Sequence, residues 1–130
     1  MFANFSKITE FAKVGNIAFR FMKQRVPGPY TFILPSQIHI QRKLGIKRPE
    51  IGIRMPDTIL LEELLKELSA PILNTAAKIE QNQGVLSPGE IIKTFKSKCD
   101  LFIDVGEVYE NPTNIISLIE NEPEVIRGEI

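Results

Sequence analysis

Apolar residues recur along this chain at two spacings, one typical of helices and one typical of strands. The helical spacing predicts two short helices within residues 6–25, a strong helix over 58–68 and a further helix from Pro88 to about Lys98. The candidate helix caps are Ser6, Asn16, Asp57 and the capping box "SPGE" at 87–90. In the strong helix, the residues expected to face inward are Ile59, Leu60, Leu64, Leu65 and Leu68.

The strand-like spacing predicts six short strands. They are "TFIL" (31–34), "EIGIR" (50–54), "PILNT" (71–75), "DLFIDV" (100–105), "TNIISLI" (113–119) and "EVIR" (124–127). Residues 36–49 are expected to form a polar, basic loop. Strands that alternate with helices indicate an α/β fold with a mixed sheet, in which the last two strands form an antiparallel hairpin.

The composition is that of a cytoplasmic-type soluble domain. The chain has 130 residues, of which 43% are hydrophobic and 25% are charged. It contains no apolar run of membrane length and no signal-peptide pattern, so we expect no membrane partner. One cysteine, Cys99, and one histidine, His39, exclude an internal disulfide and a metal site built on several histidines.

Charge is unevenly distributed although the net charge is zero. Residues 1–54 contain ten Lys or Arg and two Glu, which gives +8, and residues 55–130 carry −8. Such a split is typical of a basic face that binds phosphates or nucleic acid. Alternatively, the two halves neutralise each other in the fold. No phosphate-binding or nucleophile motif of a common enzyme class is present.

Arg54 lies at the end of a predicted strand, where a solvated charge would be the simplest explanation. It belongs, however, to an ordered series of segments that covers nearly the whole chain: "PGPYTFIL", "IGIRMPD", "PILNTAAK", "DLFIDVG", "NPTNIISL" and "EVIRGE". The series resembles the YrdC/YciO family, whose best-known members are threonylcarbamoyl-AMP synthases. The segment "NIAFRFMKQRVPGPYTFIL" is similar to the YciO-like branch.

The resemblance implies a partial YrdC-like fold, with a twisted mixed sheet and flanking helices, in a single domain over residues 1–130. The family makes threonylcarbamoyl-adenylate from L-threonine, bicarbonate and ATP for tRNA modification. By resemblance, the residues at a threonine-like substrate are Arg54, Asn74 and Thr113, and those at the nucleotide are Thr31, Lys78 and Arg127. ATP with Mg²⁺ is expected as a substrate, and no covalently bound cofactor is expected. The planar fork of Arg54 matches a carboxylate, whereas Asn74 and Thr113 could equally cap strand ends.

Several positions depart from the family pattern. The "S-A-N" signature is replaced by Ala76, Ala77 and Lys78, and Asn114 replaces a threonine. Glu50 stands where the family usually has a hydroxyl near ATP, and would repel phosphates unless it is paired, for example with Arg48. The front segment of the family, with its ATP-gripping lysine and arginine, has no counterpart, so the domain is expected to be truncated at its amino end.

These departures favour a nucleotide- or RNA-binding protein related to the synthases, without robust activity alone. A synthase completed by a separate chain or subunit, and a purely structural interaction domain, are the alternatives. The candidate contacts to tRNA or double-stranded RNA are Arg42, Lys43, Lys47 and Arg48. Besides RNA, the expected partners are a second copy of the chain or a polypeptide that supplies the missing half.

Overall fold

The structure of the chain is a computed structural model that describes residues 1–45, 47–77, 85–109, 111–120 and 122–130. The chain divides into two compact units, which are considered separately. The sheet unit comprises Met1–Asn74 and Thr113–Ile130, and the small unit comprises Thr75–Pro112.

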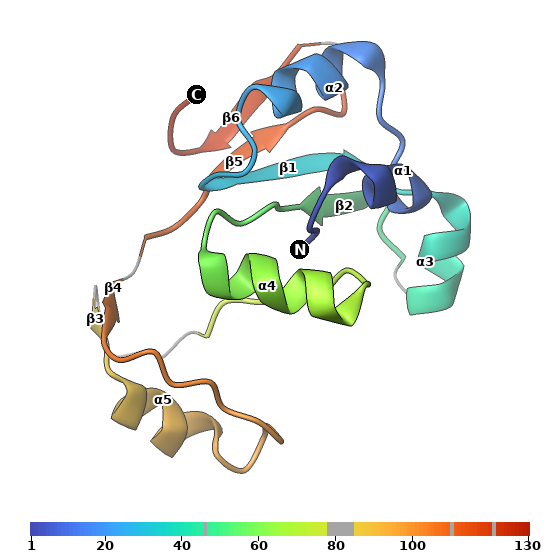
Figure 1. Cartoon of the computed structure of the whole chain (residues 1–130). Helices are drawn as coiled ribbons and strands as arrows, with labels where there is room; N and C mark the ends of the chain where they lie inside the picture. Colours follow the sequence, from blue (N-terminus) through green and yellow to red (C-terminus); the bar gives the residue numbers. More distant parts are fainter. Residues whose placement is uncertain (46, 78–84, 110, 121) are drawn as a thin grey trace. The chain divides into compact units, whose positions relative to one another are not determined.

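A four-stranded mixed sheet forms the centre of the sheet unit. Its strands are β1 (Tyr30–Pro35), β2 (Glu50–Ile53), β5 (Asn114–Ser117) and β6 (Glu124–Arg127), in the order β2-β1-β5-β6. Strand β1 is antiparallel to β2 and parallel to β5, and β5 is antiparallel to β6 (Figure 1). The sheet confirms the predicted α/β fold and the antiparallel final hairpin.

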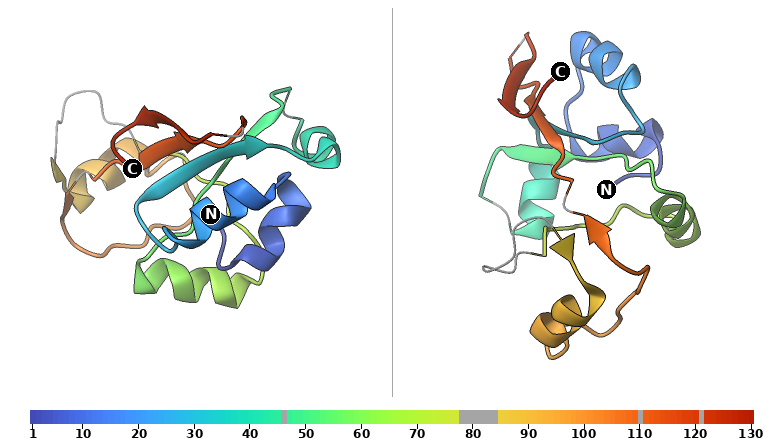
Figure 2. Two further views of the ribbon diagram at one scale, coloured as in Figure 1. Left: turned by 90° about the horizontal axis from the view of Figure 1, so that it is seen from above. Right: turned by 90° about the vertical axis from the view of Figure 1, so that its left-hand side faces the viewer.

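The first helices of the chain pack against one face of this sheet. The helical elements of the sheet unit are η1 (Phe5–Lys7), α1 (Ile8–Phe11), α2 (Asn16–Lys23), α3 (Ile38–Leu44) and α4 (Ile59–Leu68). Both views of Figure 2 show α1 and α2 on the same side of the sheet. The spacing of Ala18 and Met22 places both on the buried face of α2, because residues four apart share one face of a helix.

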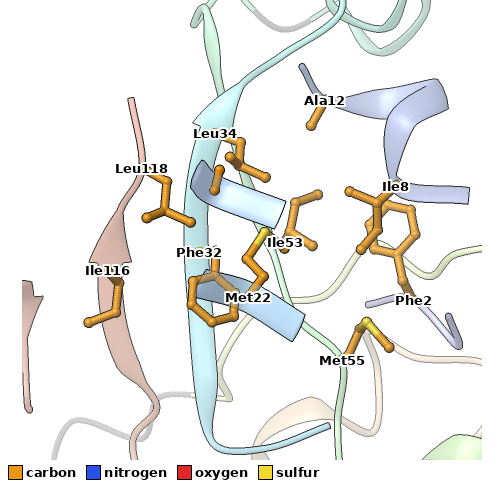
Figure 3. Packing of buried hydrophobic residues seen from close by; sticks show 11 residues of the cluster. Phe2, Ile8, Ala12, Met22, Phe32, Leu34, Ile53, Met55, Ile116 and Leu118 are labelled. Atoms are coloured by element: carbon orange, nitrogen blue, oxygen red, sulfur yellow. The ribbon is translucent and has the colours of Figure 1, made fainter. Parts of the chain in front are cut away.

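The hydrophobic core lies between these helices and the sheet. Phe32 and Leu34 project from β1 toward Ile8 of α1 and Met22 of α2, and all four side chains are fully buried (Figure 3). Because alternate residues of a strand face opposite sides, Thr31 and Ile33 face away from this core. Complete burial of a large apolar side chain contributes about 2–3 kcal/mol.

The small unit contains β3 (Val85–Leu86), α5 (Pro88–Phe95) and β4 (Val108–Tyr109), and β3 pairs antiparallel with β4. The predicted cap of α5 is confirmed, because the Ser87 hydroxyl accepts a hydrogen bond from the Glu90 amide at 3.3 Å. The helix ends at Phe95, three residues earlier than expected.

Three predicted caps are shifted by one or two residues. The side chain of Asn4, rather than that of Ser6, accepts the amide hydrogen bond at the first helical turn. Gly15 and Thr58 occupy the N-cap positions of α2 and α4 instead of Asn16 and Asp57. Neither Gly15 nor Thr58 makes a side-chain capping hydrogen bond, so the sequence located the helix starts better than the capping residues.

Three predicted segments differ from the structure. The expected loop over 36–49 contains α3, which ends at Leu44 and is followed by Gly45 as its C-cap in the left-handed conformation, φ 64°. Residues 71–75 form no strand, and residues 100–105 form none either. In the latter segment Leu101, Ile103 and Val105 are exposed, and in the described part of the small unit the strand pair is formed by β3 and β4.

Helix α4 also differs from the prediction in which residues it buries. Leu65 is buried as expected, but Ile59, Leu60 and Leu68 are 79%, 42% and 54% exposed. The sequence identified an apolar face correctly, but the rest of the sheet unit covers only part of it. No helix in the described parts of the chain is long and apolar enough to cross a membrane.

Candidate ligand site at one end of the sheet

Strand pairing brings predicted ligand residues from separate segments to one end of the sheet, on the left in Figure 1. Thr31 pairs with Ile115 on β5, and Ile115 pairs with Arg127 on β6. Thr113 directly precedes β5, and its hydroxyl lies 2.8 Å from that of Thr31. The Nε and Nη2 atoms of Arg127 donate hydrogen bonds of 3.1 and 2.8 Å to the Thr113 carbonyl. These contacts fix the backbone where the chain enters β5.

A turn after β6 supports the same corner. The Asn114 side chain accepts a hydrogen bond from the Glu129 amide at 3.1 Å. Gly128 has φ 84°, and a Cβ atom there would collide with the Asn114 side chain. The turn therefore requires glycine for both its backbone angle and its lack of a side chain. The sequence analysis noted Asn114 only as a departure from the family, although "RG" after a strand is a signal for such a turn.

Arg54 lies at the same end, on the other side of β1. Phe32 pairs with Ile53, so continuing that register places Arg54 level with Thr31. Arg54 is half-buried, and its Nε atom is buried without a hydrogen-bond partner in the described parts of the protein. Buried polar groups are usually satisfied, so an unpartnered guanidinium nitrogen is unusual. A carboxylate is the acceptor that best fits it.

The first two residues connect Arg54 to the segment after α4. The Phe2 amide donates to the Arg54 carbonyl at 2.9 Å, and Met1 and Ile72 exchange backbone hydrogen bonds of 2.6 and 3.0 Å. Burial, and secondarily the charge of Arg54, lowers the pKa of the Met1 amine below its ordinary value of 8.0. Sequence reasoning missed this contact, because two residues carry no strand pattern.

The other residues that the sequence analysis associated with ligands make no hydrogen bond to Thr31, Thr113 or Arg127 in the described parts of the chain. Asn74 is exposed and follows Ile72 by two residues. Lys78 lies outside the described residues. Glu50 pairs with Pro35, at the opposite end of β2 from Arg54. Of the predicted set, Thr31, Thr113 and Arg127 are joined by hydrogen bonds, and Arg54 lies at the same end of the sheet on the strand beside Thr31.

The predicted RNA contacts lie at the other end of β1. Arg42 and Lys43 are on α3, which follows β1 (Figure 1), and Lys47 and Arg48 follow α3. All four residues are exposed. Arg42 and Lys47 line a shallow hollow of about 320 Å³ together with Ile38, Gln41 and Gly45. The predicted small-molecule site and the predicted RNA contacts are thus at opposite ends of one strand.

The ion pairs of the described residues do not join the basic half of the sequence to the acidic half. Lys7 pairs with Glu10 at 3.9 Å, and Lys66 pairs with Glu63 at 3.6 Å. Each pair joins residues of the same sequence half, so neither neutralises one half with the other. Among the described residues, no group of three or more His, Cys, Asp or Glu side chains could hold a metal ion.

Comparison with known proteins identifies the family. Residues 1–128 match the Sua5/YciO/YrdC family, which is described as "Telomere recombination". The chain belongs to this family, and the resemblance found in the sequence is confirmed. The family is related to threonylcarbamoyl-AMP synthases in tRNA modification.

Two relatives are similar in sequence. The "Uncharacterized protein YciO" of Escherichia coli strain K12 is 35% identical over 129 residues, which are 98% of this chain and 63% of that protein. A Methanocaldococcus jannaschii protein, provisionally named threonylcarbamoyl-AMP synthase, is 32% identical over 119 residues, 90% of this chain and 55% of that protein. The chain thus spans somewhat less than two thirds of the length of these relatives.

Solved structures share the fold. The crystal structure of E. coli YciO has a TM-score of 0.83 at 35% identity and covers 95% of this chain and 61% of that one. The crystal structure of P. abyssi Sua5 in complex with L-threonine has a TM-score of 0.82 at 26% identity, over 97% of this chain and 38% of that one. Both likenesses agree with the mixed sheet and its helices.

Proposed function

We propose that this chain is a cytoplasmic nucleotide- or RNA-binding protein related to threonylcarbamoyl-AMP synthases, without robust synthase activity on its own. In this proposal the end of the sheet with Arg54, Thr31, Thr113 and Arg127 binds a threonine-like amino acid and a nucleotide. The observation that carries the proposal is the position of these four residues at one end of the sheet, although they come from segments up to 96 positions apart.

The chemistry of Arg54 supports an amino-acid carboxylate as the ligand. Its buried Nε atom lacks an acceptor, and a carboxylate can accept two parallel hydrogen bonds from a guanidinium group. The threonine complex of P. abyssi Sua5, which has the same fold, supports the same ligand class. The paired hydroxyls of Thr31 and Thr113 can also donate to a ligand, since each hydroxyl is both a donor and an acceptor.

Weak activity is proposed because groups that would organise ATP are replaced. Ala76 and Ala77 have no polar side chain, and Lys78 offers charge without the paired donor and acceptor of an amide. Preorganised charge is usually the largest catalytic contribution in such reactions. ATP, with Mg²⁺ on its phosphates, is the nucleotide that we expect to bind.

Calorimetric titration with L-threonine, in the presence and absence of ATP and Mg²⁺, tests the ligand site. We expect wild-type binding and at least about tenfold weaker binding by Arg54→Gln, because a charged hydrogen-bond pair contributes about 1.5–3 kcal/mol. Arg54→Lys retains the positive charge but not the planar pair of donors, so its affinity for threonine should lie between those of wild type and Arg54→Gln. Arg20→Gln, on the exposed side of α2, is the matched control.

Three outcomes would contradict parts of this proposal. A wild-type chain that binds neither threonine nor ATP would exclude the ligand site and favour a structural interaction domain. Arg54→Gln binding threonine as tightly as wild type would exclude the role of Arg54. Threonine-dependent release of pyrophosphate by the chain alone, at ordinary enzymatic rates, would contradict the lack of activity. Activity that arises only with a second polypeptide would favour the completed synthase.

RNA binding at the α3 end is the second candidate, favoured by the exposure of all four predicted cations. Contacts to phosphates should weaken steeply with salt and be nearly independent of base sequence. We expect tRNA or double-stranded RNA to bind at low salt, and binding to fall when Arg42, Lys43, Lys47 and Arg48 are changed to Ala. In the matched control, four other basic residues of the same sequence half are changed to Ala. These residues are Lys7, Lys13, Arg20 and Lys23. Equal loss in both quadruple variants would contradict a site at α3.

A further inference from the structure

Helix α4 carries an apolar stripe that the fold leaves largely open. Leu60, Leu64 and Leu68 recur every four residues and therefore form one row along the helix. Leu60 and Leu68 are 42% and 54% exposed, and Leu64 is half-buried. Ile59, at the start of the helix, is 79% exposed. Such a row on one helix is a common form of docking surface.

Acidic residues flank this row on one side. Glu63 and Glu67 are both exposed and are spaced four residues apart, so they form a parallel row next to the leucines. Lys66 pairs with Glu63, but the helix still has more acidic than basic groups. Two copies of α4 packed antiparallel about a twofold axis would bring these acidic rows together. Like charges at that position disfavour contact between two α4 helices.

The hollow beside α3 has the complementary chemistry. Its lining combines the apolar side chain of Ile38, which is 62% exposed, with the cations Arg42 and Lys47. Leu44, at the end of α3 but outside the lining of the hollow, is a second apolar side chain that is 45% exposed. Phosphates would use the cations but would leave these apolar groups in water. An apolar row with an acidic flank would use both.

We infer that α4 of one copy of this chain docks into the α3 hollow of a second copy. The leucine row of α4 lies against Ile38, and Glu63 and Glu67 face Arg42 and Lys47. The separation of basic and acidic residues along the chain, +8 and −8, is consistent with attraction between unlike surfaces of two copies. RNA bound to the same cations would displace the second copy.

The contact joins two different surfaces, which determines the assemblies that it can form. If both contacts form at once between two copies, the result is a closed dimer; if one forms at a time, copies add head to tail. One helix in a hollow buries less than the roughly 800 Å² per partner of a standard interface. We therefore expect weak association, visible as a mass that rises with protein concentration.

Sedimentation of the nuclease-treated 130-residue chain over a concentration series tests the inference. We expect Arg42→Glu with Lys47→Glu, and separately Glu63→Lys with Glu67→Lys, to weaken self-association by at least about tenfold. All four residues are exposed, so circular dichroism should show unchanged folding. Glu122→Lys with Glu124→Lys, on and before β6, is the charge-matched control and should associate like wild type.

Mixing the two weakened variants gives the decisive measurement. The mixture restores one original contact and one with its charges exchanged, so association should return to near the wild-type level. A monomeric wild type, association that survives either charge reversal, or a mixture that stays monomeric would overturn the inference. Association that disappears on nuclease treatment would assign the α3 surface to nucleic acid and would also overturn it.

Discussion

Replacement of Gly128 by alanine tests how the corner of the candidate site is held. Gly128 has φ 84°, and the added Cβ atom would lie 2.8 Å from Cγ and 3.2 Å from Cα of Asn114, in addition to colliding with Oδ1. The Asn114 side chain would have to move. Its movement would break the 3.1 Å hydrogen bond that it accepts from the Glu129 amide.

The expected destabilisation has two main contributions. A left-handed backbone costs an alanine about 1–2 kcal/mol relative to glycine. Loss of the Asn114–Glu129 hydrogen bond costs about 1 kcal/mol more. The total is about 2–3 kcal/mol. Gly45→Ala is a matched control in the same unit, because Gly45 has φ 64° and no atom within 4 Å of the added Cβ, so it should cost only the backbone contribution.

Urea denaturation followed by circular dichroism measures both variants, with the free energy of unfolding taken from the midpoint and slope. Asn114→Ala should reduce the additional cost of Gly128→Ala, because it removes the Cγ and Oδ1 atoms that the new Cβ would meet. If Gly128→Ala destabilises the protein no more than Gly45→Ala, the proposed contact with Asn114 is wrong.

Two further predictions concern the same end of the sheet. In a double-mutant cycle, Thr31→Val and Thr113→Val should show a coupling of about 1 kcal/mol, measured by urea denaturation; additive effects would mean that their 2.8 Å contact is not a stabilising hydrogen bond. In a protein that begins with a free Met1 amine, the lowered folded-state pKa means that the unfolded chain binds the proton more tightly. The contribution of this amine to the free energy of unfolding should therefore be fully present above pH 8.0, be lost as pH drops through the lowered pKa and stay constant below it. Acetylation of Met1 should abolish this dependence. A stability that rises toward low pH would contradict the prediction.

The strand predictions were correct where a segment with an apolar strand pattern also had a partner strand to pair with. Residues 31–34 and 124–127 became strands, whereas 100–105, with an equally clear pattern, did not. Alternation shows that one face of a segment is apolar, but pairing depends on backbone groups elsewhere in the chain. The helix within 36–49 was missed for a different reason, since Arg42 and Lys43 made that segment resemble a solvated loop.

The candidate site was predictable mainly through family resemblance. Local pattern gave no reason to associate Thr31 with Thr113, because their contact depends on the parallel register of β1 and β5. Individual side-chain hydrogen bonds could not be predicted from the sequence for the same reason. Asn114 was counted only as a missing threonine, and its bond to Glu129 became visible once β5 and β6 were paired.

The arrangement along β1 also bears on how the two proposed surfaces work. Thr31 is near the start of this six-residue strand, and α3 begins three residues after its end. At about 3.3 Å per strand residue, the two ends are separated by roughly 15–20 Å. Substitutions so far apart, without shared partners, usually act independently. Arg54 and the cations of α3 should therefore contribute to separate binding events, so that loss of threonine binding on Arg54→Gln would leave RNA binding intact. A threonine held at the Arg54 end is also too small to span this distance to the α3 cations, so coupling between threonine binding and RNA binding would have to act through the protein.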